Sequence, residues 1–345
     1  MQQNGYYCEK GRLKRAMQRL RYSKRVWHIV IFFTAMYLPF CSSVPAMDTT
    51  FELATGYDDN VAEVTEAEGS GMVQYRAQFA QSLLKEKTGP EFDLFLDAVY
   101  SQYFDFENNF QVRLGTELST APFFDRFRAG MFVEAVAYRD DLVAEDEYNT
   151  LLVGGNIQWL ATARLTLSLR QTFSKVDYQN SVSLPGQRIY TVDMGKGKGS
   201  GGHETIVEDE WITLSQEDSV SATEMMATYA MGPDFQTDLS FLYRDSSSSN
   251  DYETYQEIGG YAKITWFCTE SLEVFVSGYL STLDYETAPE GIDRSDDIHG
   301  ASLGGNWWMG SVKLFVQVDR TENDSPISGE DYQKSVALCG VSYTF

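Results

Sequence analysis

The sequence is poor in cysteine and histidine. Its four cysteines, Cys8, Cys41, Cys268 and Cys339, lie far apart and form no CxxC pair, which excludes a disulfide framework and a cysteine-based metal site. Of the three histidines, none has a spacing to serine and acidic residues that indicates a hydrolase. We therefore expect neither an enzyme nor a cofactor or metal site.

Basic residues and long apolar runs are also scarce. Lysine and arginine total 27 against 50 aspartates and glutamates, which gives a formal net charge of −23. A chain this acidic repels phosphate backbones, so nucleic-acid binding is excluded. After residue 46 no segment approaches the ~18 consecutive apolar residues of a membrane-spanning helix, so this part should contain none.

The first 46 residues differ from the rest in charge and hydropathy. They hold eight of the basic residues and one acidic residue, followed by the apolar segment Val26–Phe40 and small residues up to Ala46. A basic region, a short apolar segment and small residues are typical of a secretory signal peptide. We therefore predict that residues 1–46 are cleaved after export, with Met1 or Met17 as the start. An uncleaved anchor is the alternative, and Phe40 before Cys41 argues against a lipoprotein.

From residue 49 onward apolar residues alternate with polar or small ones. In "SVKLFVQVD", Val312, Leu314 and Val316 fall on one side of an extended chain and Lys313 and Phe315 on the other. This period of two predicts β-strands with one apolar face. Fourteen such segments are expected, at 49–58, 72–84, 92–104, 109–119, 125–139, 148–159, 162–176, 220–232, 235–247, 254–267, 271–284, 296–308, 311–322 and 333–345.

The connections between these segments alternate in length. Every second connection is short, and the others are mostly longer and acidic, the longest being Asp177–Ser219. Strands of ten to fifteen residues with short turns at one end and long loops at the other are typical of an outer-membrane barrel. We predict an all-β, antiparallel up-and-down transmembrane barrel of about 14 strands over residues 47–345, with short periplasmic turns and long extracellular loops. Residues 177–219 would be an extracellular or inward-folded loop; two soluble β-sandwiches are the alternative.

Both ends of the expected barrel carry informative residues. The last segment, "VALCGVSYTF", places Val341, Tyr343 and Phe345 on one face, and this resembles the terminal strand of bacterial outer-membrane β-barrels, which the barrel assembly machinery recognises. The opening "FELATGYDDNV" from Phe51 resembles uncharacterised β-barrel porin families of Gram-negative bacteria. The resemblance implies a barrel in the outer membrane and assigns no binding residues. An open edge would leave backbone groups unpaired in hydrocarbon, so the first and last strands should pair.

A set of charged residues has the opposite parity from the apolar face and should line the lumen. Its members are Arg76, Asp93, Asp97, Arg113, Glu117, Arg128, Glu134, Arg164, Arg170, Glu224, Asp238, Lys263, Glu273 and Lys313. A polar, mixed-charge interior suits a water-filled channel. The alternative is that these charges pair across the wall and only stiffen the barrel. Inward aromatic residues would be either a stacking track for solutes or packing beneath a loop.

Together these features predict an outer-membrane channel for the passive diffusion of small polar solutes, with a weak preference for cations. The expected partners are outer-membrane lipids, lipopolysaccharide, the assembly machinery and small solutes. Two alternatives stay open: a non-conducting structural or surface-interaction barrel, and an export channel for a secreted polysaccharide. The sequence does not determine the solute or the oligomeric state.

Overall fold

The computed structural model describes residues 47–63, 68–85, 89–143, 146–179, 182–193, 203–214, 216–249, 253–287, 293–327 and 330–345. The predicted signal peptide, with Met17 and Cys41, lies outside these residues. Within the described chain, no helix is long and apolar enough to cross a membrane.

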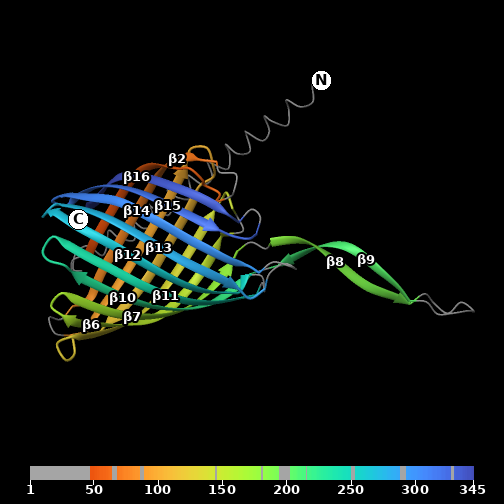
Figure 1. Cartoon of the computed structure of the whole chain (residues 1–345), viewed down its shortest axis with the longest axis horizontal. Helices are drawn as coiled ribbons and strands as arrows, with labels where there is room; N and C mark the ends of the chain where they lie inside the picture. Colours follow the sequence, from red (N-terminus) through yellow and green to blue (C-terminus); the bar gives the residue numbers. More distant parts are fainter. Residues whose placement is uncertain are drawn as a thin grey trace, which may run out of the picture. The chain divides into compact units, whose positions relative to one another are not determined.

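Strands make up most of the described chain (Figure 1). They are β1 Met47–Asp58, β2 Ser70–Lys85, β3 Glu91–Tyr103, β4 Asn109–Ser119, β5 Phe127–Asp140, β6 Tyr148–Thr162, β7 Leu165–Tyr178, β8 Val182–Asp193, β9 His203–Leu214, β10 Glu217–Ala230, β11 Phe235–Ser248, β12 Tyr255–Thr269, β13 Leu272–Tyr285, β14 Ser295–Met309, β15 Val312–Asp324 and β16 Tyr332–Thr344. Among the described residues, fourteen of these strands, β1–β7 and β10–β16, form one closed antiparallel barrel. The predicted fold class and strand number are confirmed.

The barrel is apolar on the outside, the reverse of a soluble protein. Large apolar side chains are exposed along every second position, as with Met131 at 70% and Leu280 at 66%. In the described residues the buried apolar side chains are few: Ala54, Met72, Phe132 and Leu283. A wall with an apolar outer face and a polar inner face is stable when hydrocarbon surrounds it. The alternation in the sequence therefore produces both faces of the barrel.

Pairing between β1 and β16 closes the barrel, as predicted. Their register runs from Thr50 opposite Thr344 to Asp58 opposite Val336. Just beyond β16, the backbone N–H of Phe345 donates to the carbonyl of Thr49 at 2.9 Å. Every strand of the barrel thus has two neighbours, which satisfies its backbone groups without water.

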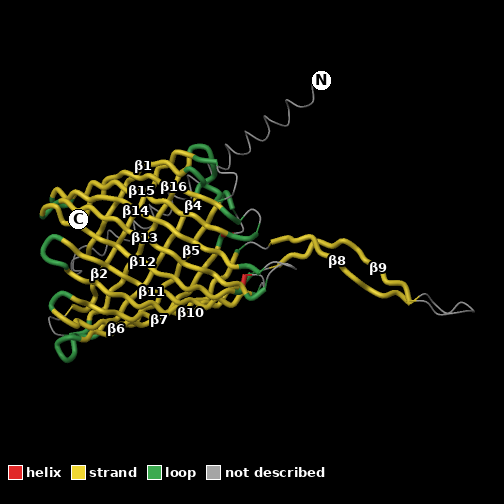
Figure 2. Tube along the Cα trace, in the orientation of Figure 1, coloured by secondary structure: helices red, strands yellow, loops and turns green. Residues whose placement is uncertain are grey.

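The two ends of the barrel differ in their connections (Figure 2). At one end, here called the short-turn end, β6–β7, β12–β13 and β14–β15 are each joined by two residues. At the other, the long-loop end, the connections are mostly longer, and one of them contains β8 and β9. These two strands pair only with each other, from Val182 opposite Leu214 to Asp193 opposite His203. The 177–219 segment, read from the sequence as a loop, thus contains a hairpin; its inward folding stays a prediction.

Candidate functional site: the inner wall of the barrel

The predicted charged residues lie on the strand face opposite to the exposed apolar side chains. Arg76, for example, lies next to the exposed Tyr75 on β2, and Glu134 lies between the exposed Val133 and Ala135 on β5. Thirteen of the fourteen predicted residues are in such strand positions. Arg164 is the correction: it falls in the turn between β6 and β7, because β7 begins only at Leu165.

Ion pairs join strands of the inner wall that are adjacent or separated by one strand. Arg76 bonds Asp97 in a bidentate pair at 2.6 and 2.9 Å, and Arg128 bonds Glu91. On the other side of the barrel, Arg244 bonds Glu257 at 2.6 Å. Lys313 lies 3.5 Å from Glu52 across the β16 strand that separates their strands. These pairs support the alternative in which wall charges stiffen the barrel.

One carboxylate joins two arginines. Glu134 is 6% exposed and bonds Arg113 at 2.6 Å, with Arg170 on its other oxygen at 3.6 Å. Because β4, β5 and β7 supply these three residues, the cluster crosses four neighbouring strands. A buried carboxylate needs such partners to offset its desolvation.

Another group of inner-wall carboxylates has no basic partner among the described residues. Asp93, Glu117, Asp238, Glu273 and Asp319 each bond a neutral side chain: Ser82, Asn156, Gln236, Asn306 and Gln317, respectively. Glu224, opposite Arg170 in register, forms no ion pair within the described chain. Neutral donors leave the negative charge in place. The inner wall therefore carries more negative than positive charge.

Inward aromatic rings pack over glycines of the neighbouring strands. A Cβ atom on Gly115 would lie 2.3 Å from the ring of Phe95, one on Gly154 2.4 Å from Phe132, and one on Gly304 2.4 Å from Phe275. Only glycine leaves room for a ring at these positions, because any side chain would occupy the same space. These three rings therefore pack directly against the backbone of the neighbouring strand.

Cations cover the exposed faces of the same rings. Arg113 lies 5.4 Å from the centroid of Phe95, Arg170 4.2 Å from Phe132, and Lys263 4.6 Å from Phe275. Each ring thus lies between a glycine and a cation, a favourable arrangement for the π-system. The sequence suggested a stacking track or packing under a loop. For these three rings the structure shows a third arrangement, in which each ring packs over a glycine and lies beside a cation.

The inner surface of the long-loop end holds a second group of aromatic residues. Tyr138, Tyr148 and Tyr178 lie there on adjacent strands β5, β6 and β7, and Tyr255 and Tyr285 on β12 and β13. Tyr138 has the inward parity predicted from the sequence, but the group of five was not predicted. The signal was present, since four of the five are the first or last residue of a strand and have inward parity.

Arg294, just before β14, is a cation at this end. Its guanidinium lies 3.7 Å from the centroid of Tyr285 and bonds Asp296 at 3.2 Å, with Glu253 at 3.6 Å. Burial raises the pKa of Glu253, and the positive charge of Arg294 opposes that rise. The charge of Arg294 therefore keeps this carboxylate ionised more readily than burial alone would allow.

The "GYDDN" segment that carried the family resemblance forms a buried turn at the same end. Asp58 and Asn60 are 1% and 0% exposed. Asp58 accepts from the backbone N–H of Asn60 at 3.0 Å and pairs with Lys334 at 3.2 Å, while the Asn60 amide donates to the carbonyl of Gln333 at 3.0 Å. These contacts join β1 to β16, so the segment stabilises the closure of the barrel.

Exposed aromatic side chains form belts on the outer wall. At the short-turn end Phe127 stacks on Trp159 at 5.9 Å, and Phe235 on Trp266 at 6.1 Å. Tyr57 is among the exposed rings toward the long-loop end. Amphipathic rings at two levels are typical of the two interfaces of a membrane.

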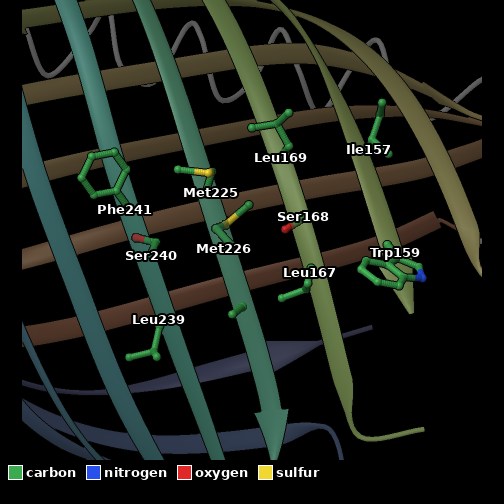
Figure 3. A pocket seen from close by; sticks show the side chains of 11 residues that line it. Ile157, Trp159, Leu167, Ser168, Leu169, Met225, Met226, Leu239, Ser240 and Phe241 are labelled. Atoms are coloured by element: carbon green, nitrogen blue, oxygen red, sulfur yellow. The ribbon is translucent and has the colours of Figure 1, made fainter. Parts of the chain in front are cut away.

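A hollow of about 520 Å³ lies on this outer wall across β6, β7, β10 and β11 (Figure 3). Its walls include Trp159, Leu167, Met225, Leu239 and Phe241. The outward residues are apolar and match the surrounding belt, so the hollow belongs to the lipid-facing surface and not to the inner wall.

The predicted assembly residues lie on the outer face of β16 and just after it. Val341, Tyr343 and Phe345 are 38%, 42% and 69% exposed. The ring of Phe345 packs edge-to-face on Phe51 and Tyr343. Their recognition by the assembly machinery stays a prediction. Within the described chain, no group of three or more His, Cys, Asp or Glu residues is arranged to hold a metal ion.

No known protein family and no curated protein matches the sequence. Solved structures do match the fold. An anion-selective porin from Comamonas acidovorans is 11% identical, with 88% of this chain and 99% of that chain covered and a TM-score of 0.50. The trimeric form of OmpT from Vibrio cholerae is 8% identical over 88% and 100%, with a TM-score of 0.49. A FadL homologue from Pseudomonas aeruginosa is 11% identical over 87% and 90%, with a TM-score of 0.46.

At these identities the likeness concerns the fold alone. The closed 14-stranded wall, the apolar outer face and the likeness to the Comamonas porin agree. This chain has the fold of a Gram-negative outer-membrane β-barrel protein.

Proposed function

We propose that the chain is an outer-membrane channel through which small polar solutes diffuse, with a preference for cations. The observation that carries the proposal is the excess of carboxylates on the inner wall of the closed barrel. Asp93, Asp238, Glu273 and Asp319 bond neutral side chains and form no ion pair among the described residues. Fixed negative charge along a pore attracts cations and repels anions.

The orientation and route to the membrane belong to the same proposal. Residues 1–46 act as a cleaved signal peptide, the short-turn end faces the periplasm, and the long-loop end faces outward to lipopolysaccharide. The assembly machinery recognises the C-terminal end of β16. Length asymmetry between the two sets of connections supports this orientation.

Reversal potentials test the channel and its preference together. The protein is reconstituted in planar bilayers under a KCl gradient. We expect single-channel steps and a reversal potential whose sign indicates that K⁺ passes more readily than Cl⁻. A triple variant, Asp238→Asn with Glu273→Gln and Asp319→Asn, should shift that potential toward the anion side, because it removes three unpaired charges. A reversal potential on the anion side in the unaltered protein would contradict the preference.

Absence of conductance steps would contradict the channel itself. In that case the non-conducting surface barrel becomes the better assignment. A gel-mobility shift on heating in detergent distinguishes a folded, closed barrel from a misfolded preparation and serves as the control.

A further inference from the structure

Three tyrosines form a continuous arc on the inner surface of the long-loop end. Tyr138 lies opposite Tyr148 in the β5–β6 register, and Tyr148 lies opposite Tyr178 in the β6–β7 register. Their ring centroids are 5.5 and 6.1 Å apart. All three side chains are half-buried, and no described cation covers them, unlike Phe95, Phe132 and Phe275 deeper in the wall.

Two carboxylates accompany this arc. The Tyr138 hydroxyl donates to Asp140 at 2.7 Å, and Asp218, which is 6% exposed, lies on the neighbouring strand β10 close to Tyr178. Neither aspartate forms an ion pair within the described residues. The adjacent Arg139 has the opposite parity on β5, and its guanidinium is held by the carbonyls of Tyr138 and Tyr148 at 2.6 and 2.9 Å. The arc therefore combines π-faces and negative charge without a counter-cation.

The same end contains an equivalent group of residues that does hold a cation. Tyr255 and Tyr285 pack at 5.4 Å, and the Arg294 guanidinium lies over Tyr285 at 3.7 Å while it bonds Asp296 and Glu253. In this barrel, tyrosine faces with adjacent carboxylates thus accommodate a guanidinium group. Both the quadrupole of the ring and the carboxylate charge attract it.

We propose that Tyr138, Tyr148 and Tyr178, with Asp140 and Asp218, form a binding site for organic cations, namely amines, quaternary ammonium groups or guanidinium compounds. Aromatic faces with nearby carboxylates recognise such groups by cation–π attraction and charge. This site would define organic cations as the solute class of the proposed channel, and that step rests on the proposed function. Binding itself requires only the folded chain.

Choline and its neutral isostere 3,3-dimethyl-1-butanol test the site. The full chain is folded in detergent, and binding of each compound is measured by saturation-transfer NMR titration. We expect choline to bind at least about tenfold more tightly than the isostere, because the two share a shape and differ in charge. Equal binding of the two compounds would overturn the proposal.

Matched tyrosine variants locate the site. Tyr148→Leu should weaken choline binding about fivefold, whereas Tyr148→Phe, which keeps the ring, should retain most of it. Tyr243→Leu removes an exposed tyrosine of the outer wall and should leave choline binding unchanged. The heat-dependent gel shift confirms that each variant is folded. Unchanged choline binding in a folded Tyr148→Leu protein would place the cation elsewhere and overturn the assignment.

Conductance separates this inference from the proposed function. Choline binding without single-channel steps would retain the site and reject the channel. Single-channel steps without choline binding would retain the channel and reject the site. Asp140→Asn combined with Asp218→Asn should weaken choline binding while leaving isostere binding unchanged; loss of both to the same extent would contradict a role for charge.

Discussion

At the scale of single residues, the inner wall depends on which charge pairs with which. Glu134 has two arginine partners, whereas the partner of Asp319 within the described chain is a neutral glutamine. The Nε atom of Arg170 is buried without a hydrogen-bond partner in the described chain. The Glu134 carboxylate is therefore the main group that offsets the charge of this arginine.

Replacement of Glu134 by glutamine should destabilise the barrel. Removing one partner of a buried ion pair costs about 3–5 kcal/mol, but Arg113 and Arg170 are partly exposed, so we expect about 1–3 kcal/mol. Urea unfolding of the folded barrel in lipid vesicles measures this. Asp319→Asn is the matched control, since it removes an equal charge without an ion pair and should change stability by less than about 0.5 kcal/mol. Equal losses in the two variants would refute the argument.

At the scale of strands, glycine positions decide where rings can pack. Gly154 on β6 faces inward beneath Phe132, whereas Gly260 on β12 faces outward, with Ser240 O at 3.7 Å as the nearest atom to an added Cβ. Both glycines lie in the interior of a barrel strand. Their different surroundings are set by the face of the sheet.

Gly154→Ala should therefore be costly and Gly260→Ala nearly neutral. An added Cβ at Gly154 would lie 2.4 Å from Phe132 and 2.6 Å from the backbone oxygen of Gln171, which cannot move freely. Overpacking of this kind costs about 1–3 kcal/mol. Thermal unfolding of the two variants, followed by circular dichroism, gives the comparison. A neutral Gly154→Ala would show that Phe132 can leave the wall at little cost.

At the scale of the whole molecule, closure of the barrel is the essential step. Contacts at both ends of the β1–β16 pair support it: the buried Asp58 and Asn60 at the long-loop end, and Phe345 against Phe51 at the short-turn end. Every other pair of neighbouring barrel strands is consecutive in the chain, except β7 and β10, which are linked through β8 and β9. The β1–β16 pair therefore brings together the residues that are most distant in the sequence.

Phe345→Ala should reduce the yield of folded barrel and leave export unchanged. The variant loses two edge-to-face ring contacts, each about 0.5–1.5 kcal/mol, at the closing pair. The fraction of heat-shifted protein in outer-membrane extracts measures folding, and the periplasmic fraction measures export. Phe173→Ala, an exposed outer-wall position without a ring contact in the described chain, is the control. Wild-type yield for Phe345→Ala would count against a closing role.

The sequence by itself determined the fourteen barrel strands and their two faces, because alternation and loop length are local properties. It also determined the closure, because an open edge would leave backbone groups unpaired in hydrocarbon. It did not determine that Glu134 lies between Arg113 and Arg170, that Gly154 lies beneath Phe132, or that three tyrosines form one arc. Those contacts follow from the register between strands, which only the closed barrel sets. The β8–β9 hairpin was not predicted from the sequence for another reason. Its residues do not alternate strongly, and the hairpin is defined by the pairing of its two strands with each other.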